Sequence, residues 1–547
     1  MAPTPSIPRD PERARVERLR PNSFELSGSV FLIAGDGKIV KLPIPSENPH
    51  DPLNWSWRKR GLSLLSAGLF AYIGTVLTQG ASLALKGLEA SFPLKQMFPF
   101  TIETLVTAPT VLMGLGAFLW IPLTFALGRR PVFIIAAFLQ VAAALGASAS
   151  KSYYELLACV SLLGFADGFG LSVLFLIVID VTFIHQRPRA IAAVWSTVGG
   201  YGVISLSCVP PLTNHGTQWR RFYIYWSIPA AITFVMALLV FPETYFKRPT
   251  VAYNGLTIQQ TASERIIIYE DDNINQSDDW SNKGLPHTPS RSWIRAFVDQ
   301  YFFSRSTTTS WMSMLYCYPQ IFFCSLNPLI FWVVIMTAVN FAGMMFIGAT
   351  FPIILTSPPY SLKSSIVMVS NSAGIGGLLA WPSVEFLSCF VLKNLARRNK
   401  GIREAEHYLV CYILPVVTGS LSTLIYGLAV SRQWSFPIYC IAYGFNGFSF
   451  ASLAIANTLW VTEAFPRWAA PALVVVGGGS YVASFLISLA LVPWIATQGY
   501  LIVGIELAGL QIVSGLILTP IAFWGKDLRQ KIHGRWAERR DGALRPL

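Results

Sequence analysis

The sequence has 547 residues, of which 53% are hydrophobic and only 13% charged, and its formal net charge is +13. Ordinary soluble domains carry about 25% charged residues, so this composition excludes a soluble globular protein. The 17 Trp and 36 Phe residues suit a lipid-facing surface and would form sticky patches in water. The Lys and Arg residues cluster at the ends of apolar runs, which indicates membrane borders and excludes nucleic acid as a partner.

The first 60 residues are polar and mixed in charge, and they predict a cytosolic N-terminal segment. Their one apolar stretch is too short for a signal-peptide core, so the first membrane helix is expected to act as the insertion signal. A helix needs about 20 apolar residues to cross a hydrocarbon core of ~30 Å. Six such runs follow, at residues 62–85, 104–127, 131–149, 156–179, 190–212 and 222–241.

A polar stretch rich in Asp, Asn, Ser and Pro then predicts a cytosolic linker over residues 243–326, because it cannot span a bilayer. The remaining apolar runs lie at residues 331–355, 364–390, 408–430, 436–462, 468–495 and 500–524. Residues 526–547 are expected to form a cytosolic tail. The sequence thus predicts an all-α membrane protein of twelve transmembrane helices, in two six-helix bundles over residues 61–242 and 327–525, with both termini in the cytosol.

Corresponding borders of the two halves look alike, which indicates an internal duplication. After the fourth apolar run Asp180 is followed by Arg187, and after the tenth Glu463 is followed by Arg467. An acid followed by a base therefore recurs at equivalent places in the two halves.

Four short motifs stand at helix borders in chain order. They are Asn48-Pro49-His50-Asp51-Pro52-Leu53-Asn54-Trp55-Ser56-Trp57-Arg58-Lys59, Leu119-Trp120-Ile121-Pro122-Leu123 leading into Gly128-Arg129-Arg130-Pro131-Val132, Pro242-Glu243-Thr244, and Arg397-Arg398-Asn399-Lys400-Gly401 with Arg403 and Glu404. Together they resemble the helix borders of fungal drug:proton antiporters of the major facilitator superfamily, over residues 48–525. The resemblance implies the major facilitator fold, alternating access, and a family range of drugs, toxins, secondary metabolites, polyamines and related organic solutes.

Two departures from this family pattern change what is expected. Phe125 stands where the superfamily's first signature has an Asp, so the charge latch of the first half is expected to be incomplete. Its counterpart acid in the second half is expected to be Glu385, with Arg397 and Arg398 as partners. The antiporter signature is a glycine-rich run ending in Gly-Pro, whereas here the run that ends at Gly202 is followed only later by Pro, which weakens the expectation of antiport.

The clearest ionisable residue within a predicted span is Asp167, which lies near the middle of its run and is flanked by Gly164, Gly168 and Gly170. An intramembrane charge is costly unless it is paired, hydrated or neutralised, and small neighbours allow a helix or a ligand to approach closely. A carboxyl there can take up and release a proton, or pair with a cationic substrate. The alternative is a protonated Asp that only hydrogen-bonds between helices.

Further candidates for a central substrate site are polar or aromatic residues within the spans. They are Glu103, Asn340, Trp381, Tyr443, Asn446 and Asn457. Glu103 either lines the outer vestibule or reaches water by snorkelling. The aromatic faces suit a flat or cationic substrate, although most aromatic residues in such a protein face lipid or pack between helices.

Charged residues near the cytosolic borders are candidates for a gate. They are Arg129, Arg130, Asp180, Glu385, Arg397, Arg398 and Glu463. Pairing of these acids with these bases is expected to hold the inner side shut while the outer side is open. The alternative is ordinary interfacial charge that caps helix ends.

Several other protein classes lack support in the sequence. It contains no phosphate-binding loop of an ATP-driven pump, its seven Cys include no CxxC pair, and its six His are scattered, so we expect no enzyme, no metal site and no cofactor. The predicted function is proton-coupled secondary transport of a small organic molecule by a monomer in the cell membrane, preferably efflux of a hydrophobic or cationic metabolite. The alternatives are uptake of a nutrient or polyamine, and a non-transporting sensor of the same fold.

Overall fold

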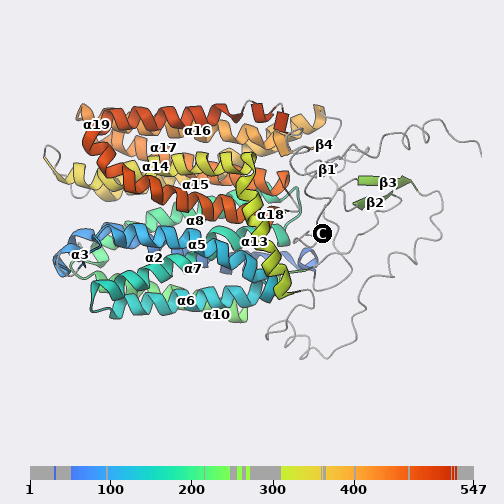
Figure 1. Cartoon of the computed structure of the whole chain (residues 1–547), viewed down its shortest axis with the longest axis horizontal. Helices are drawn as coiled ribbons and strands as arrows, with labels where there is room; N and C mark the ends of the chain where they lie inside the picture. The colour runs from blue at the N-terminus through green and yellow to red at the C-terminus, as the bar shows by residue number, and fades with distance from the viewer. Residues whose placement is uncertain are drawn as a thin grey trace, which may run out of the picture.

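The fold is a bundle of long helices lying side by side, with the helix α13 (Trp311–Leu326) crossing one end of the bundle (Figure 1). Two short antiparallel strand pairs lie outside the bundle, β1 (Val30–Phe31) with β4 (Ile402–Arg403) and β2 (Leu256–Gln260) with β3 (Ile266–Glu270). The computed structural model describes residues 30–31, 51–93, 97–214, 216–246, 256–260, 266–270, 309–358, 360, 365–398, 402–403, 405–465, 468–518, 520–522 and 524–525.

The first half of the chain forms six long helices. They are α2 (Trp57–Gln79), α5 (Thr104–Leu127), α6 (Arg129–Ala149), α7 (Tyr153–Val181), α8 (Arg187–Leu206) and α10 (Trp219–Leu239), with the short helices η1 (Pro52–Asn54), η2 (Gly80–Leu83), α3 (Leu85–Ser91) and α9 (Val209–Leu212) before or between them. Ser152 and Glu155 form a capping box that begins α7. Gly128, with φ 99°, makes the tight turn between α5 and α6. Because α7 packs against α2, α5 and α6, it is the most buried span of this half.

The second half repeats this pattern of long helices. They are α14 (Pro328–Thr356), α15 (Ser365–Arg398), η4 (Ala405–Tyr412) leading into α16 (Ile413–Ser431), α17 (Phe436–Ala464), α18 (Ala469–Leu473), the π-helical turn η6 (Val474–Gly479) and α19 (Ser480–Leu516). The side chain of Asn327 caps the start of α14. The preceding helix α13 lies within the segment predicted as linker, and the sequence analysis did not anticipate it.

Ten segments of the described residues are long and apolar enough to cross a membrane. One of them, Ala469–Ala522, has 54 residues, and a continuous helix of that length would measure roughly 80 Å, more than twice the hydrocarbon thickness. It is broken at Gly499, where φ is 79° and the helix kinks. The parts before and after this kink are each long enough for one crossing. The 20-residue helix α8 packs in the bundle but is not among the ten. The number of twelve crossings stays a prediction.

The buried apolar residues are distributed differently at the two ends of the bundle. At the end where α10 finishes and α14 begins, here called the linker end, one cluster contains residues from both halves, including Trp120 and Phe125 with Trp332 and Trp460. At the opposite end, the buried residues of the two halves fall into two separate clusters, one around Trp219 and one around Tyr426. The halves are therefore joined through their apolar core at the linker end.

Close backbone contacts form the seam between the halves, where α8 packs on α15 and α17, and α5 packs on η6 and α19. A Cβ at Gly200 of α8 would lie 2.7 Å from Leu378 Cγ and 2.9 Å from the Gly374 carbonyl of α15. On the other side of the seam, a Cβ at Gly114 of α5 would lie 2.7 Å from the Gly478 carbonyl oxygen of η6. Only glycine allows the helices to approach this closely.

Replacing Gly200 by Ala should therefore loosen the seam. The added methyl group is overpacked against α15, and overpacking of this kind costs about 1–3 kcal/mol. We expect a lower melting temperature of the detergent-solubilised protein. The matched control is Gly199→Ala, because a Cβ at Gly199 meets nothing within 4 Å. Equal melting temperatures for the two variants would show that the seam is not packed as described.

Candidate functional site

Buried polar side chains gather at mid-depth of the bundle, between the apolar clusters. This polar layer consists of Gln140, Asp167, Asn340, Asn446, Ser449 and Gln511, each at most 2% exposed. Asp167, for example, follows Leu163 of the cluster at the opposite end and precedes Phe169 of the cluster at the linker end. The layer thus includes three of the residues predicted for the substrate site, Asp167, Asn340 and Asn446.

Asp167 on α7 is packed between α2 and α6. A Cβ at Gly74 of α2 would collide with the Asp167 carboxyl and lie 2.8 Å from Gln140 Nε2, so the glycine leaves room for both polar groups. Gln140 Nε2 donates to the Phe70 carbonyl at 3.2 Å. Within the described residues, Asp167 Oδ2 and Gln140 Oε1 have no hydrogen-bond partner. An unpartnered carboxyl at this depth is costly, which makes Asp167 a candidate functional residue.

The second half contributes an amide and hydroxyl network to the layer. Asn340 Nδ2 on α14 donates to Ser449 Oγ on α17 at 2.6 Å, and Ser449 Oγ donates to the Pro415 carbonyl on α16 at 2.6 Å. Gly419 admits the Gln511 amide from α19, since a Cβ there would collide with it. The Oδ1 atoms of Asn340 and Asn446 have no partner in the described part of the chain. The atoms of the layer without a hydrogen-bond partner in the described residues are therefore carboxyl and amide oxygens, which can accept hydrogen bonds.

Aromatic rings stand beside the layer on the side of the second half. The ring centroid of Phe341 lies 5.4 Å from Tyr481 and 5.9 Å from Phe450. Tyr481, on α19, is within electrostatic range of Asp167 on α7. The carboxyl of one half and an aromatic group of the other half therefore lie in the same region of the seam.

The other predicted substrate residues lie outside the polar layer. Trp381 is half-buried on α15 and packs against the cluster at the linker end. Tyr443 belongs to the cluster at the opposite end and contacts Phe351 with ring centroids 5.3 Å apart. Glu103 is exposed at the start of α5. Asn457 is also buried, but it lies nearer the end of α17 than Asn446 does, and its Nδ2 donates to Thr337 Oγ1 at 2.7 Å.

Sequence reasoning missed four residues of this region, Gln140, Ser449, Gln511 and Tyr481. Gln140 left a readable signal, because it is the one polar side chain in the interior of an otherwise apolar run. Ser449 and Gln511 left none, since serine and glutamine are tolerated at many helix contacts. Only the packing of α14, α16, α17 and α19 brings them together.

The loop between α5 and α6 at the linker end is held around Arg129. Its guanidinium lies over the rings of Phe125 and Tyr245, 5.3 and 4.9 Å from their centroids. Arg129 Nη1 also donates to Thr124 Oγ1 at 2.7 Å, and Nε lies 3.4 Å from Asp180 Oδ2. The expected pairing of Arg129 with Asp180 is present, and the Phe at the position of the family's Asp supplies an aromatic face instead of a charge.

Glu243, from the Pro242-Glu243-Thr244 motif, caps the start of α6. Its carboxyl accepts hydrogen bonds from the backbone N–H groups of Arg129 at 2.9 Å, Arg130 at 3.1 Å and Tyr245 at 2.8 Å. Burial raises the pKa of the Glu243 carboxyl, while these three N–H groups and the nearby Arg129 charge act in the opposite direction. A Cβ at Gly128 would lie 2.5 Å from Glu243 Oε2, so the turn needs glycine for space as well as for its positive φ.

Among the described residues, two ion pairs cross the seam at the linker end, and both use α8. Arg187 Nη1 lies 3.2 Å from Glu463 Oε1 on α17, with both side chains less than a tenth exposed. Arg189 Nε lies 3.2 Å from Glu385 Oε1 on α15, where the arginine is largely exposed. A neutral hydrogen bond, from Trp195 Nε1 to Thr458 Oγ1 at 2.9 Å, joins the same two helices as the first pair.

These pairs differ from the predicted partners of the gate acids. Glu463 contacts Arg187 and Glu385 contacts Arg189, and neither Arg187 nor Arg189 was among the predicted partners. Arg398 is exposed at the end of α15, and the side chain of Arg397 lies outside the described residues. The Arg130 guanidinium donates to the Leu238 carbonyl at 2.7 Å and so ties α6 to α10 within one half. The repeated pattern of an acid followed by a base contains both members of the buried pair, because Arg187 follows Asp180 in the first half and Glu463 is the acid of the second half.

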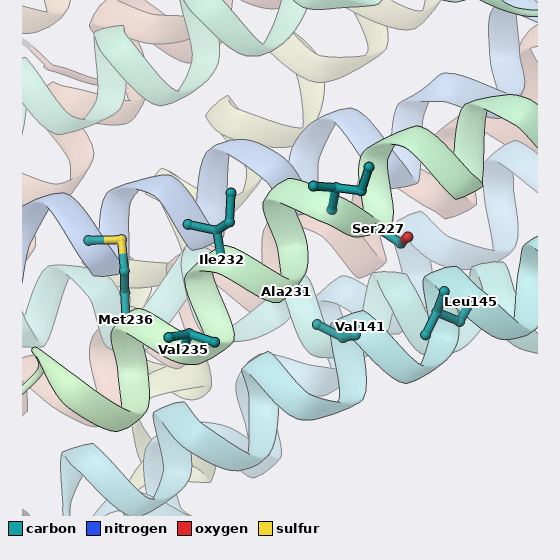
Figure 2. A pocket seen from close by; sticks show the side chains of 8 residues that line it. Val141, Leu145, Ser227, Ala231, Ile232, Val235 and Met236 are labelled. Atoms are coloured by element: carbon teal, nitrogen blue, oxygen red, sulfur yellow. The ribbon is translucent and has the colours of Figure 1, made fainter.

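A groove of about 480 Å³ lies on the outer wall between α6 and α10 (Figure 2). Its lining consists of Val141, Leu145, Ser227, Ile228, Ala231, Ile232, Val235 and Met236. It contains no ionisable group, and several of its lining side chains are half exposed or more on the lipid-facing surface. The groove is therefore a contact surface for lipid and not part of the polar layer.

The family model of the Major Facilitator Superfamily matches residues 61–488. The chain belongs to the major facilitator superfamily. This membership confirms the predicted major facilitator fold and makes the protein a membrane-embedded transporter of a small molecule, in a family whose members are generally transporters and not enzymes.

Two curated relatives of this superfamily member are similar over most of both chains. One is the uncharacterized MFS-type transporter C1271.10c of Schizosaccharomyces pombe, 22% identical over 90% of this chain and 89% of its own length. The other is Protein HOL1 of Saccharomyces cerevisiae, 22% identical over 90% of each chain.

Solved structures with the same fold include the xylose transporter XylE from E. coli in a partially occluded inward-open conformation. XylE matches with a TM-score of 0.53 and 13% identity over 84% of this chain and 97% of its own. The human organic anion transporter MFSD10 matches with a TM-score of 0.51 and 13% identity over 84% of this chain and 99% of its own. At these identities the likeness shows the major facilitator fold alone.

The buried pair Arg187–Glu463 should matter more to this transporter than the exposed pair Arg189–Glu385. Arg187→Ala leaves Glu463 buried without its partner, which costs about 3–5 kcal/mol, whereas loss of an exposed pair costs about 0–1 kcal/mol. We expect a clear drop in melting temperature for Arg187→Ala and little change for Arg189→Ala. The exchanged pair Arg187→Glu with Glu463→Arg should recover part of the loss. Equal effects of the two single variants would contradict this ranking.

Proposed function

We propose that the protein is a proton-coupled secondary transporter of a small hydrophobic or cationic organic molecule, with Asp167 as the group that carries the proton. The observation that supports this proposal is Asp167 Oδ2, which is buried at mid-depth and has no hydrogen-bond partner among the described residues. A carboxyl in this environment is neutral when protonated and needs a cation or water when it is not. Its protonation can therefore change which arrangement of the two halves is stable.

The rest of the transport cycle follows from the seam. The linker end is closed by the shared apolar cluster and by Arg187–Glu463, Arg189–Glu385 and Trp195–Thr458. For this end to open, these contacts must separate while α8 and α5 rock against the second half. We assign the linker end to the cytosol, with both chain termini there, so the arrangement described is closed to the cytosol.

The chemistry of the polar layer favours a substrate with hydrogen-bond donors and positive charge. The unpartnered atoms Asp167 Oδ2, Asn340 Oδ1 and Asn446 Oδ1 are all acceptors. The adjacent rings of Phe341 and Tyr481 offer apolar and π surface to a cation. An anionic substrate would meet no basic side chain among the residues of this layer.

We propose efflux across the cell membrane by a monomer as the direction of transport, supported by the resemblance of the helix-border motifs to drug:proton antiporters. Uptake of a nutrient or polyamine is the second candidate. A specific observation favours it, namely that α8 lacks the Gly-Pro ending of the antiporter signature.

Asp167→Asn should abolish gradient-driven transport while leaving the protein folded and in the membrane. Asparagine keeps the shape and is neutral, so the site resembles the protonated form and can no longer release a proton. In proteoliposomes we therefore expect loss of accumulation driven by an imposed pH gradient, with exchange of labelled for unlabelled substrate retained.

The matched control is Glu89→Gln on α3, which removes an exposed carboxyl far from the layer in sequence and fold. This variant should transport like the wild type. Normal gradient-driven accumulation by Asp167→Asn would refute the proton-carrying role, and would leave Asp167 as a protonated residue that only packs between helices.

The direction and substrate class can be determined together in a strain that lacks its own transporters for organic cations. Efflux predicts that expression of the protein raises resistance to a toxic cation and lowers its accumulation. Uptake predicts the reverse, namely lower resistance and higher accumulation. Binding of cationic solutes without either change would support the non-transporting sensor and would overturn both transport proposals.

A further inference from the structure

The helix α13 is unusual in position and composition. It crosses the linker end while the neighbouring helices run along the bundle (Figure 1), and its 16 residues from Trp311 to Leu326 include no charged side chain. A helix that is apolar all round is stable only when it is surrounded by protein or lipid. The structure shows how much of this helix the protein covers.

The inner face of α13 packs on the bundle. Cys317, Gln320, Ile321 and Cys324, spaced as one stripe of a helix, are buried. They pack against α5 of the first half and against α14, α18 and η6 of the second half. The start of α13 is fastened to α5 by the hydrogen bond from the Ser310 N–H to the Phe125 carbonyl at 3.1 Å. The helix therefore bridges the seam.

The outer face of α13 is apolar and uncovered. It consists of Trp311, Met312, Leu315, Tyr316, Tyr318, Phe322 and Leu326, whose side chains are between 37% and 63% exposed. Such a dense row of large apolar groups is not stable against water. Aromatic Trp and Tyr residues are those that proteins place at the boundary between lipid headgroups and acyl chains.

We propose that α13 lies in the plane of the membrane at the linker end, with its outer face embedded in the lipid interface. Continuity with an existing lipid surface identifies lipid as the partner: α13 leads through Asn327 directly into α14, whose Phe331 and Ile335 are also exposed on the outer wall. Isolated interfacial helices carry a charged face toward water, whereas the inner face of α13 is covered by the bundle and needs none. A soluble protein partner would leave this row of aromatic groups in water whenever it dissociated.

Lipid contact at α13 affects how the linker end opens and closes. The helix holds α5 on one side of the seam and α18 with η6 on the other, next to the Arg129 network. When the linker end opens, α13 must lose its contacts with one of the two halves. A helix anchored in lipid remains at the interface during this movement and stays available to close the seam again.

The test measures whether position 322 contacts lipid. The seven cysteines are replaced by serine or alanine, and a nitroxide is attached to the full chain at Phe322→Cys after reconstitution into vesicles of phosphatidylcholine and phosphatidylglycerol. Collisions with oxygen, which concentrates in lipid, are compared with collisions with a water-soluble nickel chelate. We expect oxygen to dominate at Phe322.

Two positions calibrate this result. Ile232→Cys on α10 is 54% exposed on the outer wall and reports lipid, and Lys151→Cys is exposed in the turn before α7 and reports water. A ratio at Phe322 like that at Ile232 supports the proposal. A ratio like that at Lys151, or exclusion of both reagents by a protein partner, overturns it. As a second measurement that keeps the native cysteines, benzoylphenylalanine at Phe322 should crosslink to phosphatidylcholine, and crosslinking only to protein would contradict lipid contact.

Discussion

The low dielectric of the bilayer is the constraint on which the rest of this structure depends. Because an uncompensated polar group in hydrocarbon costs several kcal/mol, polar side chains can exist at depth only where other polar groups or a ligand meet them. The chain concentrates them accordingly. One layer at mid-depth contains Asp167 and the amides of Asn340, Asn446 and Gln511, and the charged side chains that cross the seam are paired with each other at the linker end.

The polar layer and the ion pairs lie at different depths of the bundle. The apolar cluster at the linker end isolates the layer from that side of the membrane, and the contacts that hold this cluster shut are few and directional. Close backbone contact between the two halves depends on Gly200, Gly374, Gly114 and Gly478. Backbone contacts of this kind can be released and remade without rearranging side chains, which is what two rigid bodies that rock against each other require.

Much of the fold could be predicted from the sequence, because apolar runs of about 20 residues have few other stable structures. Asp167 was predictable for the same reason, since a lone acid in such a run stands out. The partners of Asp167 were not, because Gly74 and Gln140 matter only through the way that α2 and α6 pack on α7. The described partners of Glu463 and Glu385 were not predicted, because Arg187 and Arg189 lie on a helix of the other half and only the packing of the two halves brings them near. The helix α13 was missed because its 16 residues are too few to span and it follows a polar stretch.

The aromatic support of Arg129 has a further consequence. Many ionic contacts weaken when acid neutralises the carboxylate or when salt screens the charges. The faces of Phe125 and Tyr245 have no proton to gain in the acid range, and their attraction for the guanidinium comes from a fixed quadrupole. The ring of Phe125 at this turn thus holds the Arg129 guanidinium by a contact that persists at acidic pH or high salt, under conditions in which a carboxylate in its place would lose its charge or be screened.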